Sequence, residues 1–488
     1  MRNRRADLAR LWFAATLTAC VYALMLVYAY PLLGWYDVPL LDLGKLAGFG
    51  VLPAASLVCG YILVFAFYLV AWRAASRLSG RHAAIAVMGA GILFSLILIW
   101  AYPVGANDIY DYIFRARLWG LYDYNPLTVT PLQVNDDPWF PYVVWVWFAS
   151  PYGPFWADVS VLVYRLAGDS LLANLLLFKL LAILCAAGIS ALLFDLLRER
   201  DEGEALGAVL LFAWNPLLLF ETAVNGHNDI VMMLLLVVAL WLYRREWLWA
   251  ALMLATLAAL VKLAAVVALP VLLVAGAQRL WAQHRTPPVR VLMASLGCCL
   301  LAALVVYAPL WQGAQTFAGL WALDNRFTAS PAAIVKLVLE QGVGREPAEW
   351  LARNLFTTLF LGAFLAVLRR AARAQASVPR TLLAAVALLL TLGTLWFQPW
   401  YLIWLIALGP LAGERWRRLA VVWSASALSV YLLFDFGWYW FPDFFNGGNG
   451  LVLNVTAVTI WLAPPALWLA ADRVRQARAP GQRRVMAR

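Results

Sequence analysis

The sequence predicts an all-α, polytopic membrane protein with about 14 transmembrane helices, and three observations support this fold class. Hydrophobic residues make up 64% of the chain and charged residues only 13%, whereas roughly a quarter of an ordinary soluble domain is charged. Apolar runs of about 17–25 residues, the length that crosses a hydrocarbon core of about 30 Å, recur from end to end. Arginine clusters occupy the short segments between these runs, as the positive-inside rule expects. The net charge of +11 therefore reflects membrane topology, and no nucleic-acid-binding module is visible.

The order of the apolar runs and of the basic segments between them predicts that both termini lie in the cytoplasm. The first run follows a basic N-terminus and is too long for a signal-peptide core, so it is interpreted as a retained span. The predicted spans lie at about 11–33, 46–72, 84–102, 171–197, 205–220, 230–242, 247–278 (two short helices), 291–310, 350–368, on both sides of 397–401, after 418, and at 451–471.

This topology divides the chain into three parts. Residues 1–83 form two N-terminal spans and a cytoplasmic loop, 84–472 form the transmembrane core, and 473–488 form a basic cytoplasmic tail that we expect to be disordered. The core carries external loops at 105–157 and 311–349. The first of these follows the third span and is rich in Pro, Tyr and Trp. Loops of this length are uncommon unless they are functional.

A lysine interrupts the apolar stretch at 247–278. Basic segments flank this stretch on both sides, so a single span would violate the charge rule. We therefore predict two short helices that form a hairpin, with Lys262 near its outer tip. Broken helices are tolerated where they line a cavity, and an intramembrane cation is a candidate for a functional site. The alternative is a lysine that snorkels to the membrane surface.

The segment after the third span first brings several ionisable residues together. If Asn107 caps a helix, then Asp108, Asp111, Tyr112 and Arg115 fall at i, i+3, i+4 and i+7, on one helix face. That face would present a carboxylate at the mouth of the membrane segment. The alternatives are that Asp108 only caps the helix and that Asp111 and Arg115 form an ion pair on the helix surface.

Five segments together resemble a known family. GANDIYDYIFRARLWGLYDYNP, SPYGPFW, WNPLLLFETAVNGHND, LVKLAAVVALP and QPWYLIWLIAL look like the bacterial polyprenyl-phosphate-mannose-dependent mannosyltransferases of the GT-C superfamily. The resemblance covers about residues 102–411. It implies a GT-C-like fold and a location in the bacterial inner (plasma) membrane. It also implies a lipid-phosphate-linked sugar donor, an active site on the outer face of the membrane, and an acidic base at the position of Asp108. Asp111 is the close competitor for that role.

The chemistry of such a transfer also points to particular residue types. A carboxylate must take the proton of the acceptor hydroxyl, and cations must hold the phosphate as negative charge develops on it. Asp108 or Asp111 would be the catalytic base. The candidate substrate-binding residues are Lys262, Arg326, His227, Asp229, Arg115, Tyr112, Gln398 and Tyr401.

Several of these candidates have a structural alternative. His227 and Asp229 could belong to a capped turn between two spans. Arg326 could pair with Asp324 in a solvated loop, and Tyr401 could anchor the chain at the membrane interface.

No cofactor is expected. Asp108, Asp111, His227 and Asp229 could form an oxygen-rich site for a divalent cation, but no D-x-D motif is present in the loop, so we predict metal-independent chemistry. The five cysteines lie in apolar runs and are expected to remain unpaired.

The predicted function is transfer of a sugar, by resemblance mannose, from a polyprenyl-phosphate carrier to a glycan or glycolipid acceptor, with inversion at the sugar carbon. Two alternatives remain open. A lipid-linked polysaccharide ligase or polymerase would use similar carriers, and a secondary transporter would also have broken helices. Loss of transfer in Asp108→Asn would favour the sugar transferase with an Asp base over these alternatives.

Overall fold

The structure is a computed structural model that describes residues 2–199, 201–284, 289–323, 326–373, 375–445 and 450–478. Over these ranges every regular element is a helix, and nine helices are long and apolar enough to cross a membrane. A tenth crossing is possible at the α9–α10 pair, which is bent by 46°. The all-α polytopic fold is therefore confirmed, whereas the predicted count of 14 spans is not.

The helix bounds follow the predicted apolar runs closely. The longer helices are α1 (Arg2–Tyr22, continued by η1, Ala23–Tyr28), α4 (Val51–Ala75), α5 (Arg81–Leu98), α8 (Leu171–Leu197), α13 (Ala268–His284), α14 (Val289–Tyr307), α17 (Arg345–Ala372), α20 (Glu414–Leu428) and α23 (Leu451–Arg478). The shorter helices are α2 (Leu32–Trp35), α3 (Leu43–Leu46), α6 (Asp108–Gly120), α7 (Pro154–Ala167), α9 (Glu202–Ala213), α10 (Pro216–Leu219), α11 (Asp229–Arg244), α12 (Leu248–Val261), α15 (Ala318–Leu323), α16 (Pro331–Val343), α18 (Val378–Leu388), α19 (Leu402–Ala412), α21 (Val430–Leu432) and α22 (Trp438–Trp440).

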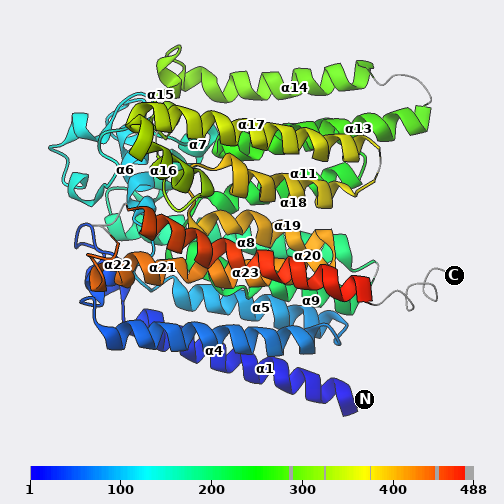
Figure 1. Cartoon of the computed structure of the whole chain (residues 1–488). Coiled ribbons are helices and arrows are strands. Elements are labelled where there is room, and N and C mark those ends of the chain that lie inside the picture. Colours follow the sequence, from blue (N-terminus) through cyan, green and yellow to red (C-terminus); the bar gives the residue numbers. More distant parts are fainter. Residues whose placement is uncertain are drawn as a thin grey trace.

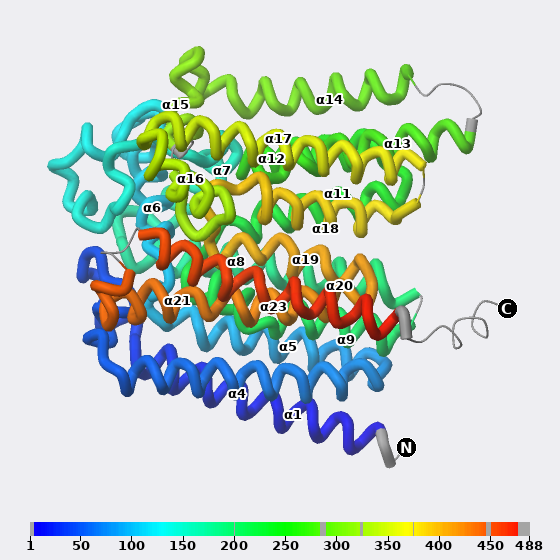
Figure 2. Tube along the Cα trace, viewed as in Figure 1, coloured from blue at the N-terminus to red at the C-terminus, as the bar shows by residue number. Residues whose placement is uncertain are grey.

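The long helices run side by side, and the two ends of the bundle differ (Figure 1). The N-terminus and the last residues of α23 lie at one end, which we call the terminal end. The segment 105–157, with α6 and α7, lies at the opposite end together with α15 and α16 (Figure 2). We call this the loop end. Helix α23 continues to Arg478, so the first residues of the tail predicted to be disordered are helical, and 479–488 lie outside the described residues.

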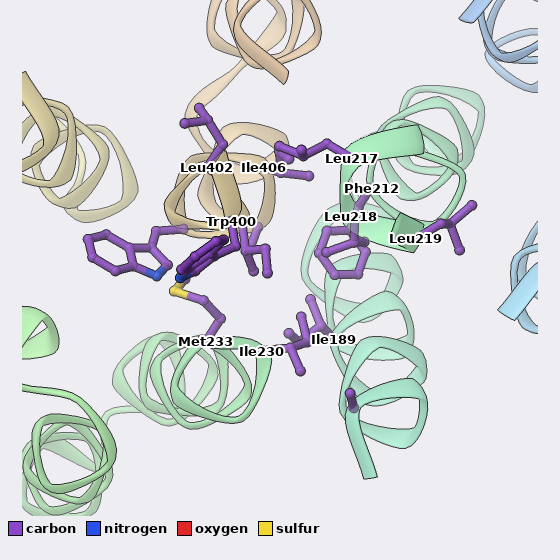
Figure 3. Packing of buried hydrophobic residues seen from close by; sticks show 14 of the residues in the cluster. Ile189, Phe212, Leu217, Leu218, Leu219, Ile230, Met233, Trp400, Leu402 and Ile406 are labelled. Atoms are coloured by element: carbon purple, nitrogen blue, oxygen red, sulfur yellow. The ribbon is translucent and has the colours of Figure 1, made fainter. Parts of the chain in front are cut away.

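Apolar packing holds the centre of the bundle together. Helices α8, α10, α11 and α19 contribute to one large cluster of buried hydrophobic side chains. Figure 3 shows Ile406 of α19 beside Leu217 of α10, and Trp400 beside Met233 of α11. The cluster fixes the positions of α11 and α19 relative to each other, and both helices carry residues of the candidate site. The five cysteines are free thiols, as predicted.

The predicted hairpin at Lys262 is present. Helix α12 ends at Val261, and Lys262 adopts an extended backbone conformation, with φ −149° and ψ 124°. A short 3-10 helix, Leu263–Val267, then leads into α13. Because of this break, Lys262, Leu263 and Val266 line the cavity described below.

Arg117 attaches the long loop to the helices at the loop end. Its side chain is 5% exposed, and its Nε donates to the carboxylate of Asp137 at 2.6 Å. The guanidinium also donates to the hydroxyl of Tyr164 at 3.0 Å and lies 4.4 Å from the ring centroid of Trp139. Arg117 of α6 therefore joins the middle of the loop to α7.

We expect Arg117→Gln to lower the free energy of unfolding by about 2 kcal/mol, because hydrogen bonds to a charged group are worth about 1.5–3 kcal/mol. The thermal unfolding midpoint of the purified protein in detergent measures this effect. Arg165→Gln, a change at an exposed arginine in the last turn of α7, is the control and should leave the midpoint unchanged. Equal midpoints for both variants would show that the Arg117 contacts do not hold the loop.

Candidate active site

A cavity of about 450 Å³ at the loop end is lined by segments that are far apart in the sequence. The side chains that line it come from helix α6, the long loop, the break after α12, the segment before α16 and the start of α19. The lining residues used below are Asp108, Arg115, Trp145, Phe148, Tyr152, Lys262, Leu263, Val266, Arg326, Trp400, Tyr401 and Trp404.

Asp108 places a carboxylate in this cavity. It is the first residue of α6, and its side chain is 14% exposed. Oδ2 accepts a hydrogen bond from the Tyr152 hydroxyl at 3.3 Å, and Oδ1 accepts one from Trp145 Nε1 at 3.5 Å. Burial and the nearby carboxylate raise the pKa of Tyr152 well above its usual value, so the phenol remains a donor. Asn107 holds the N-cap position considered from the sequence, but its side chain makes no capping hydrogen bond.

The predicted common face of α6 is only partly realised. Asp108 and Arg115 line the cavity, whereas Asp111 and Tyr112 are 1% exposed and do not. Asp111 instead accepts a hydrogen bond from Arg115 Nε at 2.6 Å, and Arg115 also donates to the backbone carbonyl of Phe148 at 3.0 Å. The ion pair between Asp111 and Arg115, which the sequence suggested for the helix surface, is therefore present but buried. Asp111 holds Arg115 in place instead of facing the cavity.

Lys262 brings an ammonium group to the same cavity. Its Nζ lies 2.9 Å from both carboxylate oxygens of Asp229, which is fully buried at the start of α11. Asp229 also accepts a hydrogen bond from Trp404 Nε1 at 2.6 Å. The ammonium lies 4.7 Å from the ring centroid of Tyr401. A buried carboxylate and aromatic rings thus fix the direction of the lysine side chain.

His227 lies behind Asp108, outside the cavity lining. It is fully buried and stacks on Trp400, with 4.3 Å between the ring centroids. Its Nδ1 is 4.0 Å from Asp108 Oδ2, and its Nε2 is 3.3 Å from Glu221 Oε2. Glu221 in turn accepts a hydrogen bond from the Tyr431 hydroxyl at 2.8 Å. His227 therefore contacts the wall of the site and does not reach into the cavity.

Arg326 also lines the cavity. Its guanidinium carbon is 4.2 Å from the ring centroid of Trp145 and 4.9 Å from that of Phe148. Among the described residues no acidic side chain pairs with it, and Asp324, the partner considered from the sequence, lies outside the described residues. Gln398 does not line the cavity, although Tyr401 does.

A close backbone approach brings the long loop to the lysine. The N–H of Gly153 donates to the carbonyl of Val261 at 3.1 Å. A Cβ at Gly153 would lie 2.0 Å from the carbonyl oxygen of Leu260, so only glycine fits there. This contact places Tyr152 next to Lys262.

The part of the chain that the structure describes contains no group of three His, Cys, Asp or Glu residues arranged to hold a metal ion. Asp229 is engaged by Lys262, and Asp111 by Arg115. The metal-independent chemistry expected from the sequence stays a prediction.

Comparison with known proteins identifies the family. The family model described as alpha-(1->6)-mannopyranosyltransferase, N-terminal domain, matches residues 13–278, which is more than half of the chain. The chain belongs to this family. It is therefore a membrane enzyme of the mannosyltransferase class, and the resemblance seen in the loop motifs is confirmed.

Two relatives of this mannosyltransferase are described as alpha-(1->6)-mannopyranosyltransferases. Alpha-(1->6)-mannopyranosyltransferase A of Mycobacterium tuberculosis is 26% identical over 419 residues, which cover 80% of this chain and 78% of the relative. Alpha-(1->6)-mannopyranosyltransferase A of Corynebacterium glutamicum is 26% identical over 178 residues, covering 36% of this chain and 35% of the relative. The family match includes Asp108, His227, Asp229 and Lys262 but ends before Arg326.

Sequence reasoning missed several residues of the candidate site of this mannosyltransferase. Tyr152 and Trp404 lie within the quoted segments SPYGPFW and QPWYLIWLIAL, yet nothing in those segments distinguishes a residue of the site from an interfacial aromatic. Trp145 sits in a loop rich in aromatic residues. Glu221 lies six residues before His227 in the quoted segment WNPLLLFETAVNGHND, and its charge inside an apolar run was a signal that could have identified it.

Proposed function

We propose that this mannosyltransferase transfers a mannosyl residue from a polyprenyl-phosphate carrier to a glycan or glycolipid acceptor on the outer face of the membrane, with Asp108 as the general base. The observation that carries this proposal is the cavity that joins Asp108, Lys262 and Arg326. Transfer on the outer face requires that the loop end of the bundle faces outward and that the terminal end faces the cytoplasm. The description shared by the relatives favours an α-(1→6) linkage.

The reaction needs a base on one side of the sugar and cations on the other. Asp108 takes the proton of the acceptor hydroxyl while that oxygen attacks the anomeric carbon. The bond from this carbon to the phosphate oxygen breaks, and the polyprenyl phosphate leaves with the electron pair. Lys262, Arg326 and Arg115 stabilise the negative charge that develops on the phosphate. A single displacement inverts the anomeric carbon, so an α-linked product requires a β-linked donor.

The shape of the cavity suits a lipid-linked donor. Beside the charged residues it is lined by Leu263 and Val266, whose surfaces are 54% and 43% exposed. Exposed apolar surface on a membrane-spanning bundle faces lipid. A polyprenyl chain can therefore remain in the bilayer while its phosphate reaches Lys262.

A donor assay tests the proposed function. Purified protein in lipid is given polyprenyl-phosphate mannose or a nucleotide sugar, together with a mannosyl acceptor. We expect bare polyprenyl phosphate to appear in a one-to-one ratio with new glycosidic bonds, and we expect no transfer from the nucleotide sugar. Transfer from the nucleotide sugar without any lipid carrier would refute the proposed donor class.

Arg326→Gln should raise the KM for the lipid donor about tenfold, because a charge-assisted hydrogen bond to the phosphate is worth about 1.5–3 kcal/mol. Initial rates measured against donor concentration in mixed micelles give this value. Arg165→Gln, an exposed arginine of α7, should leave the KM unchanged. An unaltered KM in Arg326→Gln would remove this arginine from the phosphate site.

We expect transfer to continue after dialysis against EDTA, because three cationic side chains already face the position of the phosphate. The rate with EDTA, and the rate after Mg²⁺ or Mn²⁺ is restored, measure this directly. A rate that falls with EDTA and returns with a divalent ion would show that a metal takes part.

A further inference from the structure

A second cavity, of about 610 Å³, lies at the terminal end of the bundle, away from the candidate active site. It is formed where the ends of several helices meet: α8, α11 and α19 finish there, and α9, α18 and α20 begin there. Four arginines line it, from four different helices: Arg244, Arg279, Arg380 and Arg417. One lining residue, Glu204, is acidic, so the described lining carries a net positive charge.

Backbone carbonyls hold these arginines in position. Arg380 Nε donates to the carbonyl of Ala412 at 2.9 Å, and Arg417 Nε donates to that of Pro410 at 3.0 Å. Arg279 donates to the carbonyl of Tyr243, and Arg244 to that of Leu196. A guanidinium has five N–H donors, and these bonds use one or two of each group. The arginines are thus fixed and still have donors to offer to a ligand.

The positive-inside rule explains why arginines occur at this end, but it does not explain their convergence. Arg417 is 6% exposed, and its only acidic partner among the described residues is Glu204, at 2.8 Å. Arg244 pairs with the exposed Glu199. Arg279 and Arg380 have no acidic partner within the described residues. Several cations around one cavity repel each other unless an anion shares the space.

The floor of the cavity is apolar, with Leu240, Val271 and Leu411 among the lining residues. The first turn of α18 also lines it. The free backbone N–H groups at a helix N-terminus and the positive end of the helix dipole favour a phosphate nearby. We propose that this arginine cavity binds a phosphate group, carried either by the headgroup of an acidic phospholipid or by a water-soluble phosphate ester. Basic pockets between transmembrane helices bind such headgroups elsewhere.

A binding experiment tests this proposal without measuring transfer, so its outcome is independent of the proposed function. The full-length protein in neutral detergent is titrated with phosphatidylglycerol, with phosphatidylcholine, or with glycerol 3-phosphate, and the unfolding midpoint is followed. Ala376→Glu is the main variant, because Ala376 is exposed at the cavity and the change adds a negative charge without removing any arginine contact. Ala376→Gln is its matched control for side-chain size.

We expect Ala376→Glu to weaken binding about tenfold and Ala376→Gln to change it little. Arg380→Gln should weaken binding to a similar extent. Arg73→Gln, a change at an exposed arginine in the last turn of α4 and outside the cavity, should not. If phosphatidylglycerol binds with this pattern, the ligand is a lipid headgroup; if only glycerol 3-phosphate does, it is a soluble phosphate ester.

Three results would overturn the proposal. In the first, neither phosphatidylglycerol nor glycerol 3-phosphate binds. In the second, binding is the same in the wild type, Ala376→Glu and Arg380→Gln. In the third, Arg73→Gln weakens binding as much as the cavity variants do, or phosphatidylcholine binds as well as phosphatidylglycerol does. Either result would show a non-specific attraction to the basic end of the bundle.

Discussion

Asp108→Asn should lower the transfer rate about 10³-fold, because a positioned general base contributes about 10²–10⁴-fold. Asparagine has nearly the same shape as aspartate and can keep the contacts with Tyr152 and Trp145, but it cannot accept the proton of the acceptor hydroxyl. Initial rates with saturating donor and acceptor measure the loss. The unfolding midpoint should stay close to that of the wild type, because Asp108 forms no tight ion pair.

Two matched carboxylates serve as controls for this prediction. Asp158→Asn changes a half-buried aspartate of α7 outside the cavity and should retain the rate. Asp111→Asn should lower the unfolding midpoint, because it weakens a buried ion pair, and should reduce the rate per folded molecule less than Asp108→Asn. If Asp111→Asn abolished transfer at an unchanged midpoint while Asp108→Asn remained active, the roles of the two residues would be reversed. Normal transfer in both variants would favour a ligase-like mechanism that does not use a carboxylate base.

Lys262→Met should have the second largest effect. Loss of one preorganised donor to a developing negative charge costs about 10²–10³-fold in rate, so we expect transfer to fall at least 100-fold. The change also leaves Asp229 buried without its cation, and an uncompensated buried charge costs about 3–5 kcal/mol. Transfer rate and unfolding midpoint should therefore both fall.

A double variant separates these two effects. Lys262→Met/Asp229→Asn removes both charges of the pair, so the unfolding midpoint should recover most of what the single variant lost. The rate should remain low, because no ammonium faces the phosphate. If the rate recovered together with the midpoint, Lys262 would serve stability only, and the phosphate would be bound elsewhere.

The sequence was sufficient to predict the membrane fold and the position of the main break. The length of the apolar runs and the placement of the arginines are set by the membrane and the water around it, which constrain every helix. These two patterns predicted the bounds of α8 and the hairpin at Lys262. Span number was harder to predict, because α12, α18 and α19 are shorter than a full crossing and length alone cannot classify them.

The arrangement of the site was less predictable for a different reason. Helical spacing places Asp108, Asp111 and Arg115 on one face, but α6 is buried on nearly all sides. Neighbouring segments therefore decide which side chain meets a cavity. The aromatic walls come from 145–152 and 396–404, more than 200 residues apart in the chain. Such long-range packing leaves no local pattern in the sequence.

The structure of the protein bound to a non-reactive phosphonate analogue of polyprenyl-phosphate mannose would show whether Asp108, Lys262 and Arg326 surround the donor. We predict the phosphonate between Lys262 and Arg326, the lipid chain leaving past Leu263, and the anomeric carbon on the side of Asp108. It would be contradicted by a phosphonate in the arginine cavity at the terminal end, or by a sugar that lies out of reach of Asp108.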